Sequence, residues 1–227
     1  MPPGGSAPKT AGPGLLPAGS VVVVALFAFA GLAADLMTGG PLTRMDIPIS
    51  QWFHVHNNVH FTQAMGLVSA LHGTSAICAM AAVAAALLAW ARQYRWLLAL
   101  VVSVPGGLVL NALVKHAFER TRPVFDDVPA AIHTYSFPSG HTAGATVWWG
   151  FLLLIWCGFT PRPALRLSGI VVAVLLVALT ALSRVVLGAH FPTDVVAGVA
   201  EGVAWLAGAW LLARPAHPVQ AKEGGPS

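Results

Sequence analysis

Charged side chains are scarce in this sequence. They make up 9% of its 227 residues, while 56% of the residues are hydrophobic, and about 25% of a typical soluble domain is charged. A chain this apolar cannot face water over its whole surface, which excludes a soluble globular domain. The formal net charge is only +4, and no basic cluster is interleaved with aromatic residues. The composition therefore argues against a nucleic-acid partner.

Cysteine pairs and nucleotide-binding glycine loops are missing as well. The two cysteines, Cys78 and Cys157, lie inside apolar runs and have no partner at a metal-binding spacing. Such thiols are usually packed or lipid-facing, so neither a disulfide nor a zinc site is expected. No glycine-rich phosphate loop is present. The sequence predicts no metal site and no cofactor.

Long apolar runs are what the sequence has instead. Six of them are long enough to cross a bilayer: residues 20–37, 74–91, 96–114, 142–159, 165–182 and 193–212. They predict an all-α fold, a polytopic bundle of about six transmembrane helices. Gly198 and Gly202 stand four apart in the last run and predict a close-packing face there. Pro105-Gly106-Gly107 is expected to bend or loosen the third run.

The remaining segments are polar or turn-rich. Residues 1–19 are rich in Pro, Gly and Ala and predict a disordered tail, and residues 214–227 a polar one. Between them, residues 20–213 are expected to form one membrane-embedded domain. Residues 39–48 predict a turn-rich link. Residues 49–71 favour one or two short interfacial helices, whose histidines suit an aromatic belt better than a metal site, although insertion of this segment stays open.

The first apolar run has a second interpretation. Its small residues at Ala28-Phe29-Ala30 and Ala33-Ala34 resemble a signal-peptide cleavage site. A retained span is the stronger expectation, because the six-helix topology uses this run.

Positive charge predicts the orientation of the spans. One side of the six-span layout carries seven basic residues against one acid, Glu223: Lys9, Arg92, Arg95, Arg162, Arg166, Arg214 and Lys222. Short basic connections stay in the cytoplasm, so both termini are expected there. Three polar islands, Lys115–Pro123, Pro138–His141 and Ser183–Asp194, then fall together on the outer side. We expect them to meet in one pocket at neighbouring helix ends.

Two features of these islands point to an anion. Ser139-Gly140 precedes an apolar run and predicts a helix N-terminus, whose free N–H groups and dipole attract negative charge. Lys115, Arg122 and Arg184 are cations beside low-dielectric helices and need a counter-charge. A structural ion network is the alternative, with acids that also lie on this side: Glu119, Asp126, Asp127 and Asp194. A phosphate group fits the helix N-terminus better than that network does.

Two histidines and an aspartate supply the chemistry. His190 and Asp194 are four apart, with Pro192 at the expected first turn of the last helix, so the carboxylate can orient the imidazole. An oriented, neutral histidine is a nucleophile for phosphorus. His141 is placed to protonate the leaving oxygen. The expected route is attack by His190, a phosphohistidine intermediate and its hydrolysis by water, with no metal required.

Together these motifs resemble the type 2 phosphatidic acid phosphatase superfamily, membrane lipid phosphatases related to vanadium haloperoxidases. The family pattern K-x6-R-P, P-S-G-H, S-R-x5-H-x3-D reads here as Lys115 to Arg122-Pro123, Pro138-Ser139-Gly140-His141, and Ser183-Arg184 to His190 and Asp194. The resemblance covers about residues 74–213 and implies the same roles: His190 as nucleophile, Asp194 as its partner and His141 as acid. It implies phosphate binding by Lys115, Arg122, Ser139, Gly140 and Arg184.

The resemblance to bacterial six-span members implies an enzyme of the inner membrane with its site facing the periplasm. Undecaprenyl diphosphate is the favoured substrate; phosphatidylglycerophosphate or phosphatidate is the alternative, and a head-group phosphotransferase stays open. A haloperoxidase disagrees with the membrane spans, and a non-enzymatic anion site disagrees with the intact histidine motifs. The oligomeric state stays open. Glu201, two turns past Asp194, is either functional or paired with a polar neighbour.

Overall fold

The described part of the protein is entirely helical. The computed structural model describes residues 15–125 and 134–213, and within these ranges it contains eight helices and no strand. The helices are α1 (Leu15–Thr38), α2 (Pro41–His56), α3 (Val59–Leu71), α4 (Thr74–Trp90), α5 (Tyr94–Phe118), α6 (Gly140–Phe159), α7 (Pro163–Val186) and α8 (Pro192–Ala213). The predicted all-α class is confirmed.

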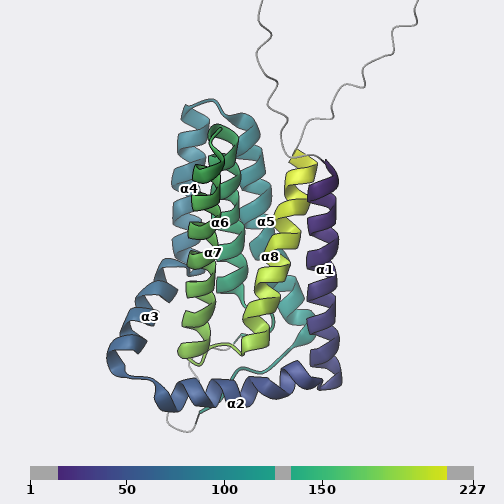
Figure 1. Cartoon of the computed structure of the whole chain (residues 1–227), viewed down its shortest axis with the longest axis vertical. Helices are drawn as coiled ribbons and strands as arrows, with labels where there is room; N and C mark the ends of the chain where they lie inside the picture. The colour runs from purple at the N-terminus through teal and green to yellow at the C-terminus, as the bar shows by residue number, and fades with distance from the viewer. Residues whose placement is uncertain (1–14, 126–133, 214–227) are drawn as a thin grey trace, which may run out of the picture.

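The long helices form a bundle with one crosswise helix at its end. In Figure 1, α1 and α4–α8 run along the long axis, α2 lies across one end, and α3 slants from α2 to α4. Five of the described helices are long and apolar enough to cross a membrane, and α3 with α4 forms a sixth candidate that is bent by 44°. The predicted membrane bundle of about six spans agrees with this arrangement.

The predicted link at residues 39–48 is wrong, because helix α2 begins at Pro41. Proline is well suited to the first helical turn, where its missing N–H has no partner to lose. Pro48 lies inside α2 and removes only one backbone hydrogen bond. The true link is short and turns at Gly39, whose φ is +60°. Helices α2 and α3 occupy the segment where one or two short helices were expected, and α2 starts several residues earlier than expected.

Other helices also extend beyond the apolar runs that predicted them. Helix α1 begins at Leu15, inside the predicted tail of residues 1–19. The rest of that tail and the predicted tail 214–227 lie outside the described residues. Helices α5 and α7 continue past their apolar runs, so that Lys115 and Arg184 lie in their last turns. Hydropathy detects the lipid-spanning length, whereas polar side chains that face other helices continue the same backbone.

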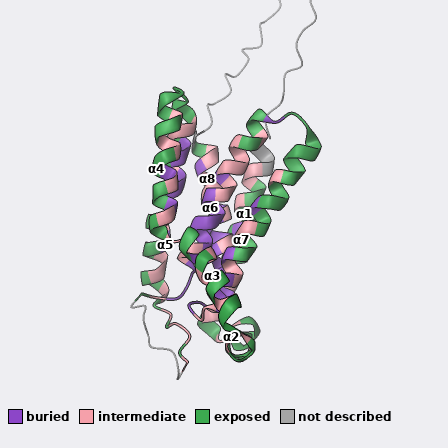
Figure 2. Cartoon of the chain, turned by 90° about the vertical axis from the view of Figure 1, so that its left-hand side faces the viewer, coloured by how far each residue is buried: buried purple, intermediate pink, exposed green. Residues whose placement is uncertain are grey.

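The interior lies between α4, α5, α6 and α8, and the outside is apolar. Figure 2 shows the buried residues gathered on α6 and α8, while α2 and the outer face of α4 are exposed. A cluster around Ile77, Leu100 and Phe151 packs α4, α5 and α6 together. Large apolar side chains such as Phe27 and Trp90 point outward from the spans. An exterior of this kind is covered by lipid, so this is an integral membrane protein.

Glycines bring α5 and α6 close to α8. Helix α5 continues through Pro105-Gly106-Gly107, and the two glycines leave room for the indole of Trp205 on α8. Trp205 Nε1 donates to the carbonyl of Ser103, 2.9 Å away. At Gly202 a Cβ would stand 2.7 Å from Thr146 Cβ and 2.9 Å from the Ala143 carbonyl oxygen. The predicted close-packing face of the last span is therefore where α8 meets α6.

This contact predicts the effect of adding one methyl group. Gly202→Ala should destabilise the protein by about 1–3 kcal/mol, because the backbone of α6 cannot yield. Gly208→Ala on the same helix is the matched control, since its Cβ meets nothing within 4 Å. Thermal unfolding in detergent measures both variants. Equal melting temperatures for the two would contradict the assigned packing.

Candidate active site

The three polar islands meet at one end of the bundle. Lys115 and Arg184 lie in the last turns of α5 and α7. His141 and Asp194 lie in the first turns of α6 and α8, and His190 lies in the link 187–191. The end of α7 and the start of α8 lie beside the crosswise helix α2 at the bottom of Figure 1, and α5 ends and α6 begins toward the same end of the bundle. The structure thus brings together every residue that the sequence predicted for the site. Their catalytic and binding roles stay predictions.

A tight turn after α7 presents His190. The N–H groups of Ala189 and His190 both donate to the carbonyl of Arg184, at 3.0 and 3.2 Å. Gly188 makes the turn possible, because its φ of +62° is strained for a residue with a side chain. His190 is consequently buried, with 2% of its surface exposed.

Asp194 is shared by several donors. Its Oδ2 lies 3.5 Å from His190 Nδ1, which is longer than a good hydrogen bond. The same oxygen accepts a hydrogen bond from the Ser136 hydroxyl and, at 2.9 Å, one from the Phe191 N–H. Its Oδ1 accepts from Arg120. A carboxylate has about four lone-pair sites, so these contacts nearly saturate it.

The tautomer of His190 follows from its second nitrogen. Nε2 lies 3.2 Å from Nη1 of Arg122, and a guanidinium can only donate. Nε2 therefore carries the lone pair, and the ring hydrogen sits on Nδ1, facing Asp194. Burial lowers the pKa of His190 to about 4, against the opposing effect of Asp194. The ring is neutral at physiological pH, with its lone pair directed at the basic cluster.

Backbone carbonyls hold Arg122 and Lys115 in place. Arg122 donates to the carbonyls of Thr134 (2.7 Å), Ala189 and Tyr135. Lys115 Nζ donates to the Tyr135 carbonyl at 2.7 Å. Burial lowers the pKa of Arg122, yet an arginine stays charged at neutral pH. Both cations are oriented without having their charge neutralised.

Arg184 keeps an unused donor inside the protein. It is 6% exposed, and its Nη1 donates to the hydroxyl of Ser69 on α3. Its Nε is buried and has no hydrogen-bond partner within the described chain. A buried donor of this kind is costly unless a ligand satisfies it, which favours an anion beside Arg184.

The ion network at this end centres on a different arginine. Arg120 pairs with Asp46 and Asp194, at 2.6 Å each. Glu119 instead interacts with the Tyr135 hydroxyl and raises its pKa. Two of the acids proposed for that network, Asp126 and Asp127, lie outside the described residues.

The start of α6 supplies backbone donors. Ser139 is the N-cap, and its hydroxyl contacts the N–H and hydroxyl of Thr142, at 3.5 and 3.1 Å. The Ser139 N–H donates to the Asp194 carbonyl (2.9 Å), which ties α6 to α8. Gly140 and His141 then offer the first N–H groups of the helix, which have no partner in the preceding turn. Ser139 Oγ accepts in both contacts, so the residue caps α6 while its phosphate-binding role stays a prediction.

Two neighbours surround the Gly140–His141 pair. A Cβ on Gly140 would stand 2.8 Å from Asn111 Oδ1, so a larger residue there would have to displace the Asn111 amide. His141 Nε2 lies on the other side, next to Gly73 at the start of α4. His141 is half-buried, whereas His190 is buried. His141 therefore reaches the basic cluster from the start of α6, and His190 from the link between α7 and α8.

Glu201 has a partner below the site. Its Oε2 accepts from Asn111 Nδ2 at 2.7 Å, and its Oε1 is buried without a partner in the described chain. Glu201 thus pairs with a polar neighbour, one of the two possibilities left open. The pair stands against Gly140 through Asn111, next to Lys115 one turn along α5.

Sequence reasoning missed the residues that support the site. It assigned no role to Asp46, Ser69, Arg120 or Ser136, each of which contacts a predicted site residue or its partner. One signal was available: Asp46 is the only acid between Asp35 and Glu119. A single carboxylate in so apolar a stretch indicates a buried partner.

Comparison with known proteins gives one family and several relatives. The model of the PAP2 superfamily matches residues 96–217. A decaprenylphosphoryl-5-phosphoribose phosphatase of Mycobacterium tuberculosis is 34% identical over 117 residues, 49% of this chain and 57% of that protein. An undecaprenyl-diphosphatase of Sulfolobus acidocaldarius is 32% identical over 134 residues, 57% of this chain and 58% of that protein.

One solved structure is similar over most of its length. It is a transmembrane PAP2-type phosphatidylglycerolphosphate phosphatase from Bacillus subtilis, 26% identical with a TM-score of 0.73, covering 83% of this chain and 94% of that one. The curated relatives are matched less completely, since the chain spans under two thirds of their length.

The buried imidazole predicts an unusual titration. His190 should stay neutral from about pH 8 down to about pH 5, because its pKa lies near 4 rather than at the ordinary value of about 6.5. The unfolded chain then binds more protons than the folded chain between these two pKa values, so stability falls as the pH is lowered through that window. NMR of ring-labelled histidine, with His190→Gln to assign the signal, measures the midpoint. A midpoint near 6.5 would contradict the assigned burial.

Proposed function

Because this chain belongs to the PAP2 superfamily, we propose that it is a membrane lipid phosphatase that transfers phosphate through His190 without a metal ion. One observation carries the proposal: the lone pair of a neutral, buried His190 faces Arg122, beside two further cations. The proposed nucleophile and the proposed phosphate-binding cations thus lie together at the end of the bundle.

The reaction has two steps. His190 Nε2 attacks phosphorus, and the bond from phosphorus to the leaving oxygen breaks while His141 gives that oxygen a proton. Water then attacks the phosphohistidine, with His141 taking a proton from it, and inorganic phosphate leaves as Nε2 is restored. The His190 ring becomes cationic as it forms the bond, and the carboxylate of Asp194 stabilises that charge through Nδ1–H.

The cations act on the transferring phosphoryl group. Its equatorial oxygens carry the charge of the transition state, and preorganised donors stabilise them at no further reorganisation. Arg122 and Lys115 are already oriented by backbone carbonyls, and Arg184 has a buried N–H to give. The N–H groups of Gly140 and His141 complete the set, so these groups bind phosphate as the family motif implies.

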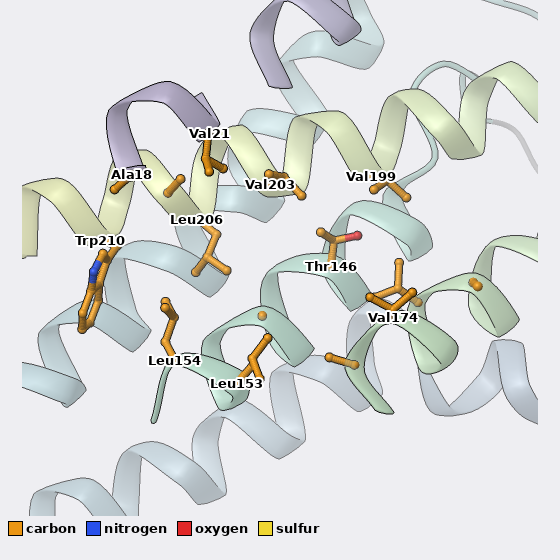
Figure 3. Close-up of a pocket in the computed structure, with 15 residues that line it drawn as sticks. Ala18, Val21, Thr146, Leu153, Leu154, Val174, Val199, Val203, Leu206 and Trp210 are labelled. Carbon is orange, nitrogen blue, oxygen red and sulfur yellow. The ribbon is translucent and has the colours of Figure 1, made fainter. Parts of the chain in front are cut away.

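An apolar cavity supports a substrate with a hydrocarbon chain. Its volume is about 550 Å³, and it lies between α6, α7, α8 and the start of α1 (Figure 3). Thr146 lines the cavity and donates to the carbonyl of Thr142, which lies in the first turn of α6. The rest of the wall is mostly aliphatic, with Leu153, Val174, Val203 and Leu206 among the residues that Figure 3 labels. A lipid tail in this cavity would leave its phosphate near the catalytic end.

Undecaprenyl diphosphate is the substrate we favour, with the terminal phosphate released. A relative that acts on a polyprenyl diphosphate and another that acts on a polyprenyl-linked phosphate support this choice. Glycerolipid phosphates are the alternative, in view of the Bacillus subtilis structure. A head-group phosphotransferase would use the same first step with an alcohol in place of water.

The orientation we propose places the site outside. The connections at the opposite end carry Arg92, Arg95, Arg162 and Arg166, and a basic end of this kind faces the cytoplasm. Helix α1 begins and helix α8 ends at that basic end (Figure 1). The site would then face the periplasm of a bacterial inner membrane, with both termini in the cytoplasm.

Phosphate release from purified protein tests the function. Undecaprenyl diphosphate, phosphatidylglycerophosphate and phosphatidate are compared in detergent with EDTA present. At least one should be hydrolysed, and His190→Ala should lower the rate by about 10³-fold or more, because the nucleophile is lost. The ranking of kcat/KM identifies the substrate class. Activity that disappears with EDTA, or survives in His190→Ala, would refute the mechanism.

Narrowing the apolar cavity tests where the lipid chain lies. Val174→Trp should raise KM for a long-chain substrate by about tenfold, the equivalent of about 1.4 kcal/mol, because Val174 lines the cavity. Hydrolysis of a short, water-soluble phosphate ester should not change. Val172→Trp is the matched control, since Val172 is also exposed on α7 but lies outside the cavity lining. Equal effects of the two variants would place the chain elsewhere.

A further inference from the structure

We propose that Arg120 and Asp46 are positioning residues for the catalytic pair, with Asp46 acting from the crosswise helix α2. This inference rests on the proposed function, in which Asp194 stabilises His190 during phosphate transfer. Neither residue belongs to the motifs that define the site. Both act through Asp194 rather than on the substrate.

Arg120 connects two buried carboxylates. Its Nη1 donates to Asp194 Oδ1 and its Nη2 to Asp46 Oδ2, each at 2.6 Å. Its Nη1 also donates to the Thr193 hydroxyl at 2.8 Å, and its guanidinium stands 4.3 Å from the centre of the Phe191 ring. A planar guanidinium held at its edge and on its face has one orientation. Arg120 therefore fixes the position of Asp194 Oδ1.

Asp46 holds both the guanidinium of Arg120 and the first turn of α8. It is 1% exposed, and besides Arg120 it accepts from the Thr193 N–H (2.9 Å) and the Thr193 hydroxyl. The Thr193 N–H belongs to the first turn of α8, so Asp46 satisfies a free helix donor from outside the helix. Thr193 directly precedes Asp194. Helix α2 is thereby fastened to the turn that carries the catalytic carboxylate.

The position of Asp194 depends on these contacts. Its Oδ2 faces His190 Nδ1 but also accepts from Ser136 and Phe191. A carboxylate can rotate about its last bond, and Arg120 on Oδ1 prevents that rotation. With Arg120 in place, Oδ2 remains on the His190 side and the ring keeps its hydrogen on Nδ1.

Asp46 also balances charge. Arg120 is a cation beside Asp194, and without Asp46 it would add to the positive cluster and leave Asp194 as its single acid. With Asp46 present, Arg120 has a carboxylate of its own, at nearly full burial. Buried charges persist only when they are paired and hydrogen-bonded. The three phosphate-binding cations thus remain available for substrate.

The closing experiment compares four single variants. Asp46→Asn keeps the shape but removes the charge, and Arg120→Lys keeps the charge but cannot bridge two carboxylates. Both should lower kcat about 10- to 100-fold with little change in KM, because the nucleophile is misplaced while phosphate binding is intact. Asp194→Asn supplies the background for a double-mutant cycle. Ser50→Ala is the matched control, one turn from Asp46 on α2 and buried without a partner in the described chain.

Two readouts separate positioning from a structural role. Asp46→Asn should have almost no further effect on kcat in the Asp194→Asn background, because both act on the same step. The ¹⁵N shifts of the His190 ring should show the hydrogen on Nδ1 in the wild type and in Ser50→Ala, and a mixture of tautomers in Asp46→Asn and Arg120→Lys. Thermal unfolding confirms that each variant is folded.

The outcomes are distinct. Unchanged tautomer and kcat in folded Asp46→Asn and Arg120→Lys would overturn the proposal, as would additive effects in the cycle. If Asp46→Asn does not fold, the kcat and the His190 tautomer of Arg120→Lys alone test the proposal. If no lipid phosphate is hydrolysed by the wild type, the proposed function fails, while a shifted tautomer in the variants would still support the positioning of His190 through Asp194.

Discussion

The cost of burying charge at a membrane face governs this structure. Cations and acids gather at one end of an apolar bundle, where an uncompensated charge is expensive. The protein meets the cost in two ways: Arg120 is paired with two carboxylates, while Lys115 and Arg122 are held by neutral carbonyls. Carbonyl oxygens orient a cation without neutralising its charge. The distribution of acids therefore separates Arg120, which is paired with carboxylates, from the cations for which we propose a phosphate.

The helix bundle and the gathering of the site residues at one end could be predicted, because the relevant information is local in the sequence. The length of the apolar runs gives the spans, and their number places Lys115, Gly140, Arg184 and Asp194 at the same end. The spacing of four between His190 and Asp194 gives their approach across the start of α8. The structure bears out the bundle and the gathering of these residues, and the family match covers the stretch in which they lie.

The rest depends on contacts that no spacing encodes. Asp46 meets Arg120 and Thr193 across 74 and 147 residues, and its surroundings of Gly and Pro predicted a link where α2 forms. Hydropathy ended α5 and α7 too early, because polar residues that face a protein pocket continue a helix without adding apolar length. The contact of Asn111 with Glu201 and Gly140 likewise arises only once α5, α6 and α8 are packed.

The family match and the contacts that build the site begin at different places in the sequence, as helix α2 shows. The family match begins at residue 96, whereas the acid that secures the turn before Asp194 stands at residue 46. A protein reduced to the matched region would retain all eight predicted site residues and lose the carboxylate that binds Arg120 and Thr193. The region that the family model matches is thus shorter than the region whose contacts build the proposed site. Sequence change in the N-terminal third of such a protein can alter turnover while every signature residue is untouched.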